Sequence, residues 1–452
     1  MHLIEPIVGI VNTVLWDYAL LFLLVATGIF FTVRLGFVQI RRFGEGLRRL
    51  FGGFSMSGKK AGKEGMSSFQ ALTTAIAAQV GTGNITGCAT ALFSGGPGAI
   101  FWMWLSAFFG MATIYAEAIL AQKFKTVDRD GHVTGGPIYY IRAAFTGKFG
   151  KFLAGFFSIA IILALGFMGN MVQSNSISDA FHTAFGVPKI VMGIIAAVIA
   201  GFIFLGGVSR IASFTEKIVP IMAIFYMVGC IIILFINHDA FWGALRSIFV
   251  CAFEPQTVFG GALGLGMKEA MRYGVARGLF SNEAGMGSTP HAHAMAKVEH
   301  PHDQGVIAMI GVFLDTFVVL TLTALVILTS GLFEPVTGSL QGTALAQAAF
   351  NAAFGSFGNA FVAICMLFFA FSTIIGWYFF GKTNVQALFG KRGVVFYTLL
   401  VLVFIVIGST QKVDLVWSLS DMFNGLMVLP NLIGLLALNG LVVRISRSKD
   451  TL

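Results

Sequence analysis

Long apolar stretches separated by short polar segments run along the whole chain of 452 residues. A helix that crosses the hydrocarbon core of a bilayer needs about 20 mostly apolar residues. By that measure the pattern predicts an all-α integral membrane protein with about eleven transmembrane helices. The predicted segments are residues 12–35, 69–94, 98–122, 152–182, 189–208, 213–236, a broken one within 258–298, 305–330, 357–381, 393–410 and 414–440.

Glycine and polar residues interrupt two of these stretches, one in each half of the chain. The first interruption is Gly81-Thr82-Gly83-Asn84, and the second runs from Phe280 to Gly287. Glycine destabilises a helix by about 1 kcal/mol relative to alanine. Backbone freed from a helix inside a bilayer is tolerated only where it is buried in protein or lines a cavity. Two such breaks in corresponding positions therefore indicate the central binding site of a transporter.

The ten segments after the first one divide into two sets of five, and each set begins with an interrupted helix. We expect a single transmembrane domain over residues 1–452. Its parts are an extra N-terminal helix (1–38), a first repeat (68–238) and a second, inverted repeat (257–440). The two halves share no residue-level repeat, so this division rests on hydropathy and on the positions of the breaks. Inverted repeats of this kind place substrate and ions near the bilayer midplane.

Composition and charge agree with a membrane protein. The chain is 57% hydrophobic and 11% charged, whereas soluble domains are about 25% charged. With the N-terminus outside, 23 of the 29 Lys and Arg residues fall in inward loops, three in outward loops and three in the broken seventh segment. This bias follows the positive-inside rule and predicts that the C-terminus lies inside. The basic residues form no stripe interleaved with aromatic residues, so we expect no nucleic-acid partner.

Two features resemble other kinds of site without satisfying their requirements. Gly53–Lys60 approaches a phosphate-binding loop, but it lacks the hydroxyl residue that holds magnesium, and no strand precedes it. His291, His293, His300 and His302 cluster near a loop, but no Cys or carboxylate pair joins them at a metal-ligand spacing. We expect a solvated loop there. The four cysteines are scattered and predict no disulfide framework. No hydrolase or redox constellation is present, so we do not expect an enzyme.

The chemistry of the first break suits a zwitterion and a small cation. Backbone N–H groups at the start of a half-helix attract a carboxylate, and freed carbonyl groups coordinate sodium. Thr82 and Gly83 are expected to offer such N–H groups to the substrate. The expected sodium ligands are the carbonyl groups of Ala77, Gln79 and Val80 and the amide oxygen of Asn84. The alternative is close helix packing mediated by the glycines.

At the second break, Phe280 is expected to form a wall of the pocket, and Ser281 and Asn282 to supply ligands. Glu283 is a carboxylate within a membrane segment, and such groups are functional by default. Two interpretations stay open for Glu283. It acts in coupling, or it has a structural role in which it caps loose backbone N–H groups or pairs with Arg277.

Polar and aromatic residues within two other spans complete the candidate site. Ser372 and Thr373 can add hydroxyl oxygens to an ion held at the first break, although mid-helix hydroxyls also bond back to their own helix. Trp377 lies one turn beyond Thr373, so both can face one pocket. Asn170 and Gln173 share a face of another helix, where either can hold the polar end of the substrate.

Four further carboxylates lie at possible membrane depth. Proton relay and helix pairing are both open for them, and pairing is the favoured interpretation. They are Glu117, Asp179, Asp315 and Asp421.

Several motifs carry a resemblance to a known family over nearly the whole chain. The sequence resembles the alanine/glycine:cation symporter family, most specifically in its last motif. The motifs are Gln79–Ile85, Gly95–Trp104, Tyr115–Ala118, Gly135–Tyr140 and Gly274–Gly285.

The resemblance implies a leucine-transporter-type five-plus-five inverted repeat with one extra helix. It also implies sodium-coupled uptake of small neutral amino acids, mainly alanine or glycine, across a prokaryotic cytoplasmic (inner) membrane. By similarity, the first break holds the carboxylate and ions, the residues from Phe280 to Ala284 face the substrate, and Ser372 with Thr373 completes a sodium site.

The expected cofactor is Na+ as a bound coupling ion, and the expected partners are an amino acid and the lipid bilayer. Three alternatives stay open. They are a proton-coupled symporter using Glu283 or Asp315, a member that prefers another neutral amino acid such as glutamine, and a channel. The sequence does not determine the oligomeric state.

Overall fold

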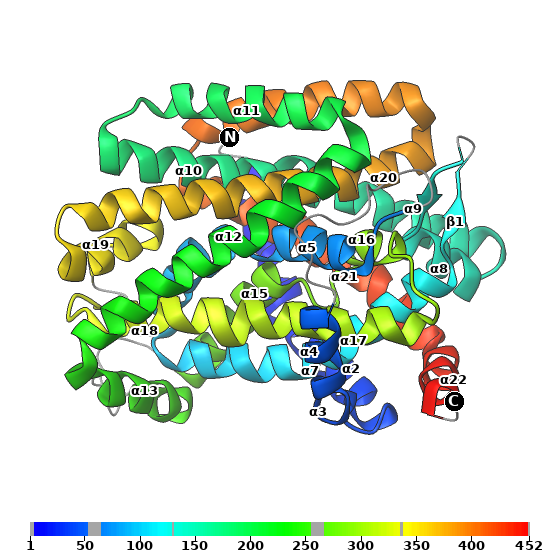
Figure 1. Cartoon of the computed structure of the whole chain (residues 1–452), viewed down its shortest axis with the longest axis horizontal. Helices are drawn as coiled ribbons and strands as arrows, with labels where there is room; N and C mark the ends of the chain where they lie inside the picture. Colours follow the sequence, from blue (N-terminus) through cyan, green and yellow to red (C-terminus); the bar gives the residue numbers. More distant parts are fainter. Residues whose placement is uncertain (1–3, 53–64, 129–130, 255–265, 335–337, 451–452) are drawn as a thin grey trace.

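Long helices running side by side make up nearly all of the structure, a computed structural model that describes residues 4–52, 65–128, 131–254, 266–334 and 338–450 (Figure 1). The segment resembling a phosphate-binding loop, Gly53–Lys60, and part of the predicted broken segment, residues 258–265, lie outside the described residues. The structure thus confirms the predicted all-α class.

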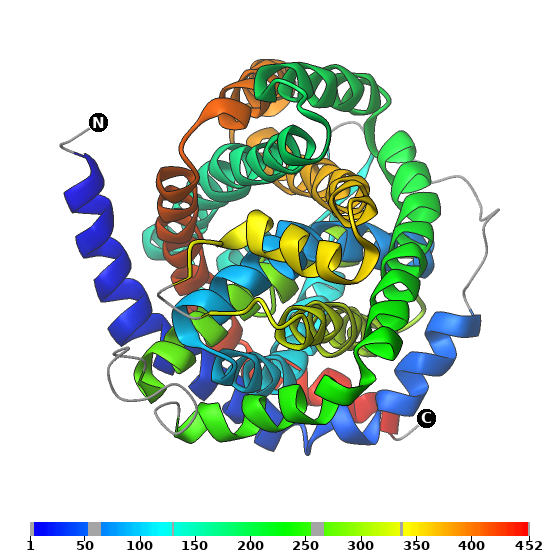
Figure 2. The same cartoon turned by 90° about the vertical axis from the view of Figure 1, so that its left-hand side faces the viewer.

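The chain begins with one continuous helix at the edge of the bundle (Figure 2). It consists of α1 (Ile4–Asn12), a π-helical stretch η1 (Thr13–Ala19) and α2 (Leu20–Arg34). Two short helices, α3 (Val38–Arg41) and α4 (Phe43–Gly52), follow it.

The first set of five segments starts with a helix in two parts, α5 (Ser68–Gln79) and η2 (Gly83–Gly87) with α6 (Cys88–Gly95). A capping box starts α5, in which Ser67 Oγ accepts from Gln70 N and Gln70 Oε1 accepts from Ser67 N. The remaining elements are α7 (Gly98–Lys123), β1 (Thr126–Val127), β2 (Val133–Thr134), α8 (Pro137–Ala144), α9 (Gly147–Ile161), η3 (Ile162–Gly169), α10 (Asn170–Phe185), α11 (Lys189–Leu205) and α12 (Gly207–Ile236).

The second set follows the surface helix α13 (His238–Phe253) and also starts with a helix in two parts, α15 (Met267–Asn282) and α16 (Pro290–Ala294). Gly390, with φ 71°, divides α20 into two helices. The remaining elements are α17 (Pro301–Val312), η5 (Phe313–Leu320), α18 (Thr321–Thr329), α19 (Gly342–Phe354), α20 (Phe357–Thr410), α21 (Val413–Ala437) and α22 (Asn439–Asp450).

Helices overlap all the predicted spans, and both predicted breaks are present. Seven of the described helices are long and apolar enough to cross a membrane. The number of eleven crossings stays a prediction. Large apolar side chains are exposed on the outside of the bundle, for example Leu205 (86% exposed) and Phe235 (75% exposed). Apolar surface of this extent marks contact with a membrane, and the chain is a multi-pass membrane protein.

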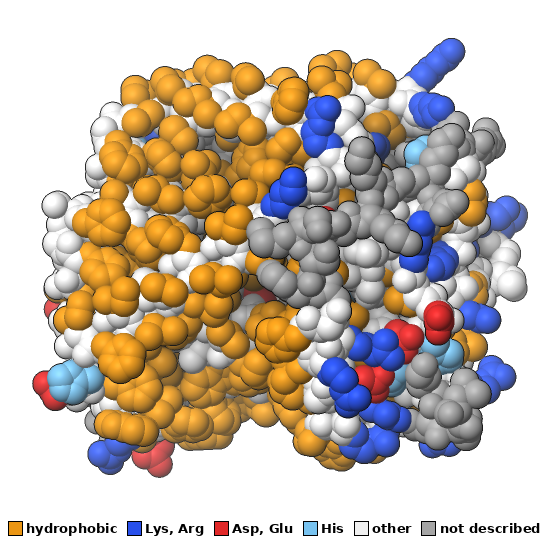
Figure 3. All heavy atoms as spheres, in the orientation of Figure 1, with side chains coloured by type: hydrophobic (Ala, Val, Ile, Leu, Met, Phe, Trp, Pro, Cys, Tyr) orange, Lys and Arg blue, Asp and Glu red, His pale blue; other side chains and the backbone are white. Residues whose placement is uncertain are grey.

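The two ends of the bundle differ in charge. Lys and Arg side chains gather at the end formed by the β1–β2 hairpin, α8 and α22, whereas hydrophobic side chains cover most of the remaining face (Figures 1 and 3). We call this end the basic end. The opposite end carries α13 and α19, and α19 lies across the middle of the bundle there (Figure 2).

The two broken helices are joined to each other near the basic end. Met66 N donates to Met295 O (2.9 Å), and Lys297 N donates to Met66 O (2.9 Å). These bonds form a short parallel bridge between the start of the first broken helix and the end of the second. The helices α5, α15 and α16, which flank the breaks, lie in the middle of the bundle (Figure 1).

Candidate functional site

The first break is a point of close approach between three helices. The helix α5 ends at Gln79, and Val80 leaves the helical conformation with φ −82° and ψ 89°. A Cβ atom at Gly81 would lie closer than 3.0 Å to Thr373 Oγ1 of α20, and one at Gly83 would lie 3.0 Å from Ser281 of α15. The glycines thus let α20 and α15 approach irregular backbone, which differs from the packing of two regular helices.

Hydroxyl and carbonyl oxygens converge on this break from two helices. Thr373 Oγ1 donates to Ala77 O (2.8 Å) and lies 3.5 Å from Val80 O. Ser372 Oγ lies 3.4 Å from Ala77 O. Both hydroxyls also contact Phe369 O on their own helix, so the back-bonding considered for them is present, and sodium binding by them stays a prediction. Oxygen atoms of these kinds suit a small hard cation such as sodium.

Asn84 links the first break to a carboxylate. Its Oδ1 accepts from Gly81 N (3.0 Å), and its Nδ2 donates to Asp315 Oδ1 (2.7 Å). Ser281 Oγ of the second break donates to the same Asp315 oxygen (2.9 Å). Asp315 therefore joins the two breaks, a role that the sequence signalled only by an acidic residue at membrane depth.

Polar side chains near the first break have unused hydrogen-bonding capacity. Thr82 N donates to Gln173 Oε1 (3.1 Å), while Asn170 Nδ2 donates to Gly166 O of its own helix (3.1 Å). Three buried atoms here, Thr82 Oγ1, Asn170 Oδ1 and Gln79 Oε1, have no hydrogen-bond partner among the described residues. Buried polar atoms are nearly always hydrogen-bonded, so these atoms are available to a ligand.

The side chain of Gln79 spans the two breaks. Its Nε2 donates to Asn282 O at the end of α15 (2.7 Å). Asn282 in turn accepts from Ala284 N through Oδ1 (3.0 Å) and donates to Thr316 through Nδ2 (3.1 Å). The predicted residues Gln79, Asn282 and Ala284 thus lie in one hydrogen-bonded group.

Glu283 at the second break has an unusual backbone conformation. Its φ of 58° is left-handed, which is uncommon for a residue other than glycine. Its Oε2 accepts from Ser288 Oγ (2.5 Å), and its Oε1 accepts from Trp377 Nε1. Glu283 is fully buried, so its carboxylate lies between the second break and α20.

Other residues perform the two structural roles predicted as alternatives for Glu283, which were pairing with Arg277 and capping the loose backbone N–H groups. Arg277 forms a bidentate ion pair with Asp421 (2.8 and 2.7 Å). The loose backbone N–H groups of Gly285 and Gly287 donate to Glu117 of α7 (3.0 and 2.9 Å). Glu117 also accepts from Asn431 Nδ2. Helix pairing is therefore the role of Asp421, and Glu117 fixes the loop after the second break.

Aromatic rings form a wall beside the breaks. The rings of Phe280 and Trp377 are 5.6 Å apart and perpendicular, and Phe280 is 4.8 Å from Trp417 of α21. The guanidinium of Arg277 lies 4.6 Å from the Trp417 ring. The predicted pair Phe280 and Trp377 is thus in contact, whereas Trp417 had no sequence signal beyond its place in the last span.

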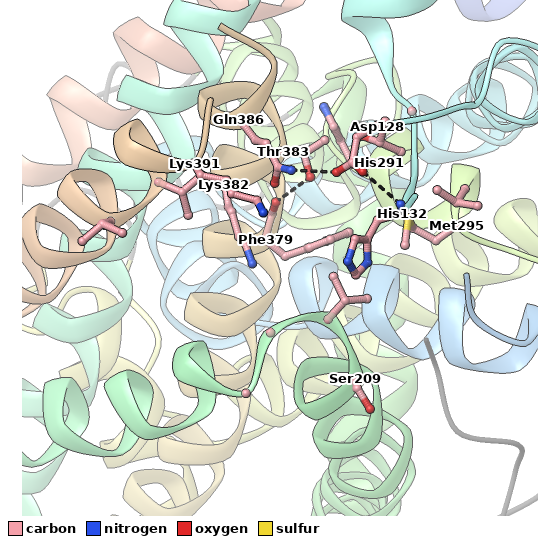
Figure 4. Close-up of a pocket in the computed structure, with 18 residues that line it drawn as sticks. Asp128, His132, Ser209, His291, Met295, Phe379, Lys382, Thr383, Gln386 and Lys391 are labelled. Atoms are coloured by element: carbon pink, nitrogen blue, oxygen red, sulfur yellow. Dashed lines mark hydrogen bonds between the residues drawn. The ribbon is translucent and has the colours of Figure 1, made fainter. Parts of the chain in front are cut away.

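The site is closed on both sides. Thr82, Ser281 and Thr373 have no exposed surface. Near the opposite end, a pocket of about 340 Å³ is lined by Arg277, Asp421 and Trp417, among others. Near the basic end, a pocket of about 590 Å³ is lined by His291 and Lys382, among others (Figure 4). Trp417 of the first pocket contacts Phe280, and His291 of the second is linked through Ser288 to Glu283, so residues of each pocket wall adjoin residues of the second break.

The prediction of a solvated histidine loop is wrong for three of the four residues. His291, His293 and His302 are each about 1% exposed. They contact Asn384, Gln304 and Tyr115, respectively. His291 and His293 are on α16, which packs against the β2–α8 turn where Gly135 and Gly136 allow close approach. His302 is on α17 and packs against Tyr115 of α7. Within the described ranges, no group of three or more His, Cys, Asp or Glu residues can hold a metal ion, and the four cysteines are free and buried.

A bundle of apolar helices with two facing breaks, lined by oxygen atoms and closed between two pockets, defines a secondary transporter of the inverted-repeat type. The fold matches the crystal structure of MhsT in complex with L-phenylalanine, with a TM-score of 0.61 and 12% identity, over 85% of this chain and 90% of that one. The predicted leucine-transporter-type architecture is thereby confirmed.

The sequence places the chain more narrowly. Residues 1–449 match the sodium:alanine symporter family, and the chain belongs to that family. It is 43% identical to the sodium/alanine symporter AgcS of Methanococcus maripaludis, over 97% of this chain and 95% of that protein. It is also 43% identical to the probable sodium/glutamine symporter GlnT of Bacillus subtilis, over 98% and 90% of the respective chains.

Proposed function

We propose that this protein is a sodium-coupled symporter that takes up small neutral amino acids, alanine or glycine, by alternating access. The observation that carries the proposal is the convergence of the Ser372 and Thr373 hydroxyls on the Ala77 and Val80 carbonyls. The family and the named function of its archaeal relative support the same substrate and ion.

The sodium site couples α20 to the first break. The proposed ligands from α20 are the Ser372 and Thr373 hydroxyls. Those from the first break are the carbonyl groups of Ala77, Gln79 and Val80 and the amide oxygen of Asn84, which accepts from Gly81 N in the structure. Sodium held between α20 and α5 fixes the backbone shape that the amino acid needs. The coupling is reciprocal, so the amino acid strengthens sodium binding by the same factor.

The membrane potential supplies part of the driving force. One elementary charge crossing 100 mV gains about 2.3 kcal/mol, which corresponds to roughly a 50-fold concentration of the amino acid. The sodium gradient adds to this value.

The amino acid is proposed to bind between the two breaks. Its carboxylate accepts from the N–H groups of Thr82 and Gly83, so it takes the place of Gln173 Oε1 on Thr82. The side chains of Asn170 and Gln173 and the backbone from Ser281 to Ala284 are then available to the ammonium group. Phe280 and Trp377 limit the room for the side chain, which favours small amino acids.

The proposed orientation places the basic end in the cytoplasm of a prokaryotic cell, with the N-terminus outside and the C-terminus inside. The Arg277–Asp421 pair and Trp417 then close the outward side of the site. Opening toward the outside requires α15 and α21 to separate at this pair.

A proton-coupled symporter is the second candidate. Two observations favour it: the buried carboxylates of Glu283 and Asp315 form no ion pair with Lys or Arg in the part of the chain that the structure describes, and both lie at the breaks. That function requires uptake driven by a pH gradient without sodium. The match to the glutamine symporter leaves glutamine as an alternative substrate.

Calorimetric titration of alanine into the purified protein tests the proposal. Binding heat is expected in sodium chloride and not in potassium chloride of the same ionic strength, because the site is incomplete without sodium. Equal binding in both salts would contradict sodium coupling. Sodium-dependent binding of glutamine without binding of alanine would support sodium coupling and identify glutamine as the substrate in place of alanine.

A further inference from the structure

The pocket near the basic end adjoins the closed site and has a charged wall. Its volume of about 590 Å³ is in the usual range of small-molecule pockets. The hairpin strand β2, the turn before α12, the half-helix α16 and α20 all contribute to the wall (Figure 4). A small amino acid fits into this space together with water.

Lys382 is a cationic group of this wall that has no acidic partner. It is partly buried, and no ion pair or hydrogen bond of its side chain is found within the described ranges. Asp128, the acidic residue of the same wall, accepts from Gln386 Nε2 (2.7 Å) and from His132 N (2.9 Å) instead (Figure 4). Removing a charge from water without a partner is costly, so an anionic group in the pocket would be favoured.

The position of Lys382 relates the pocket to the transport site. It follows Trp377 by five residues on α20, which is about 7.5 Å along the helix axis. His291, also in the pocket wall, bonds through Nδ1 to Ser288 O (2.6 Å), and Ser288 Oγ bonds to Glu283. His291 of the pocket wall is thus linked through Ser288 to Glu283 at the second break, and Trp377 donates to the same carboxylate.

A lysine near the end of a membrane helix commonly extends to the lipid headgroups. Lys382 instead lines this pocket together with Phe379, Thr383 and His291. The lysine thus faces the space that a solute enters when the layer around Trp377 opens.

We propose that this pocket is the cytoplasmic release site of the transported amino acid and that Lys382 binds its carboxylate there. The inference rests on the proposed function and adds a second, weaker binding site to it. The ammonium of Lys382 takes over the carboxylate from the N–H groups of the first break. It thereby favours release toward the basic end and recognition of amino acids that enter from that side.

Uptake of labelled alanine into oriented membrane vesicles tests the proposal. In inside-out vesicles, Lys382→Gln is expected to raise the half-saturating alanine concentration by roughly fivefold to tenfold, as for the loss of one partly hydrated charged contact. In right-side-out vesicles the value is expected to stay unchanged. Lys382→Arg should restore the inside-out value. Lys151→Gln, which removes an exposed charge on α9, should change neither value.

A second measurement needs no variant. Raising the ionic strength with choline chloride should weaken alanine recognition in inside-out vesicles more than in right-side-out vesicles, because salt screens a partly exposed charge. If Lys382→Gln, or added salt, changed the half-saturating alanine concentration equally in both vesicle types, the proposed release site would be overturned. Absence of alanine transport by the unaltered protein in both vesicle types would overturn the proposed function, and this inference with it.

Discussion

The hydroxyl group of Thr373 shows how one residue serves two elements. It bonds to Phe369 O on its own helix and to Ala77 O of the first break, 296 positions away in the chain. Gly81 makes this contact possible because a Cβ there would collide with the same hydroxyl. The proposed sodium site therefore depends on two local features, the Ser372-Thr373 pair within α20 and the glycine that lets the first break approach it.

Replacing Thr373 by alanine removes one hydroxyl oxygen from the proposed sodium site. A hydrogen bond or ligand contact of this kind contributes about 1–2 kcal/mol, so Thr373→Ala should raise the sodium concentration for half-maximal alanine binding by roughly tenfold. Among the described residues, the buried Thr329 bonds only to Leu325 O and Val326 O of its own helix, and Thr329→Ala is the matched control. Identical sodium dependence of the two variants would remove Thr373 from the sodium site.

Trp377 combines a bulky ring with an N–H donor to Glu283. We expect Trp377→Ala to admit amino acids larger than alanine, such as leucine, because the wall opposite Phe280 recedes. Trp377→Phe keeps most of the bulk without the donor and should still exclude leucine. Competition of unlabelled leucine with labelled alanine measures both effects. Unchanged selectivity in Trp377→Ala would show that the ring does not bound the substrate.

At the scale of elements, each broken helix is held by side chains from other helices. Glu117 of α7 accepts the loose N–H groups after the second break, and Gln173 of α10 accepts one at the first break. Polar groups in a bilayer must find partners within the protein. The breaks are therefore stable features of the bundle, and their oxygen and N–H groups stay aimed at one central region.

The close approach at the first break leads to a prediction about its glycine. In Gly81→Ala, the added Cβ would meet both Thr373 Oγ1 and Gln173 Oε1, so α20 must move away from the break. We expect loss of sodium-dependent alanine binding by more than tenfold while the protein stays folded. Gly155→Ala in α9, where nothing lies within 4 Å, is the control. Normal binding by Gly81→Ala, measured by calorimetry, would contradict the tight contact.

The sequence predicted the elements better than their partners. Both breaks were visible because Gly-Thr-Gly-Asn and the segment after Phe280 interrupt apolar stretches, and local composition dictates such interruptions. The capping role of Glu117, the bridging role of Asp315 and the place of Trp417 beside Phe280 depend on contacts between distant parts of the chain. The buried histidines were missed for the same reason, since their polarity indicated exposure to solvent and only the packing of α16 and α17 shows that they are buried.

At the scale of the whole molecule, the site lies between two pockets with different charge around them. The Arg277–Asp421 pair closes one side, and the layer of Trp377, Glu283, Ser288 and His291 closes the other. A closed state with a barrier on each side is what alternating access requires between its two open states. The gathering of basic residues at one end is the basis of the proposed orientation, in which that end faces the cytoplasm.

The proposed orientation predicts which residues a membrane-impermeant thiol reagent reaches in intact cells. Lys412 and Ser448 are exposed near opposite ends of the chain's last two helices, whereas the four native cysteines are buried. Lys412→Cys should react in intact cells, and Ser448→Cys only after the cells are permeabilised. The reverse pattern would show that the topology is opposite to the proposed one and that the 590 Å³ pocket faces the outside of the cell.

Accumulation of labelled alanine in proteoliposomes tests the central claim most directly. The purified protein is reconstituted, and uptake is compared between an inward sodium gradient and a matched potassium gradient. The account predicts that alanine rises above its external concentration with sodium only. Equal uptake with both cations, or uptake with sodium that stops at equilibrium, would contradict sodium-coupled symport.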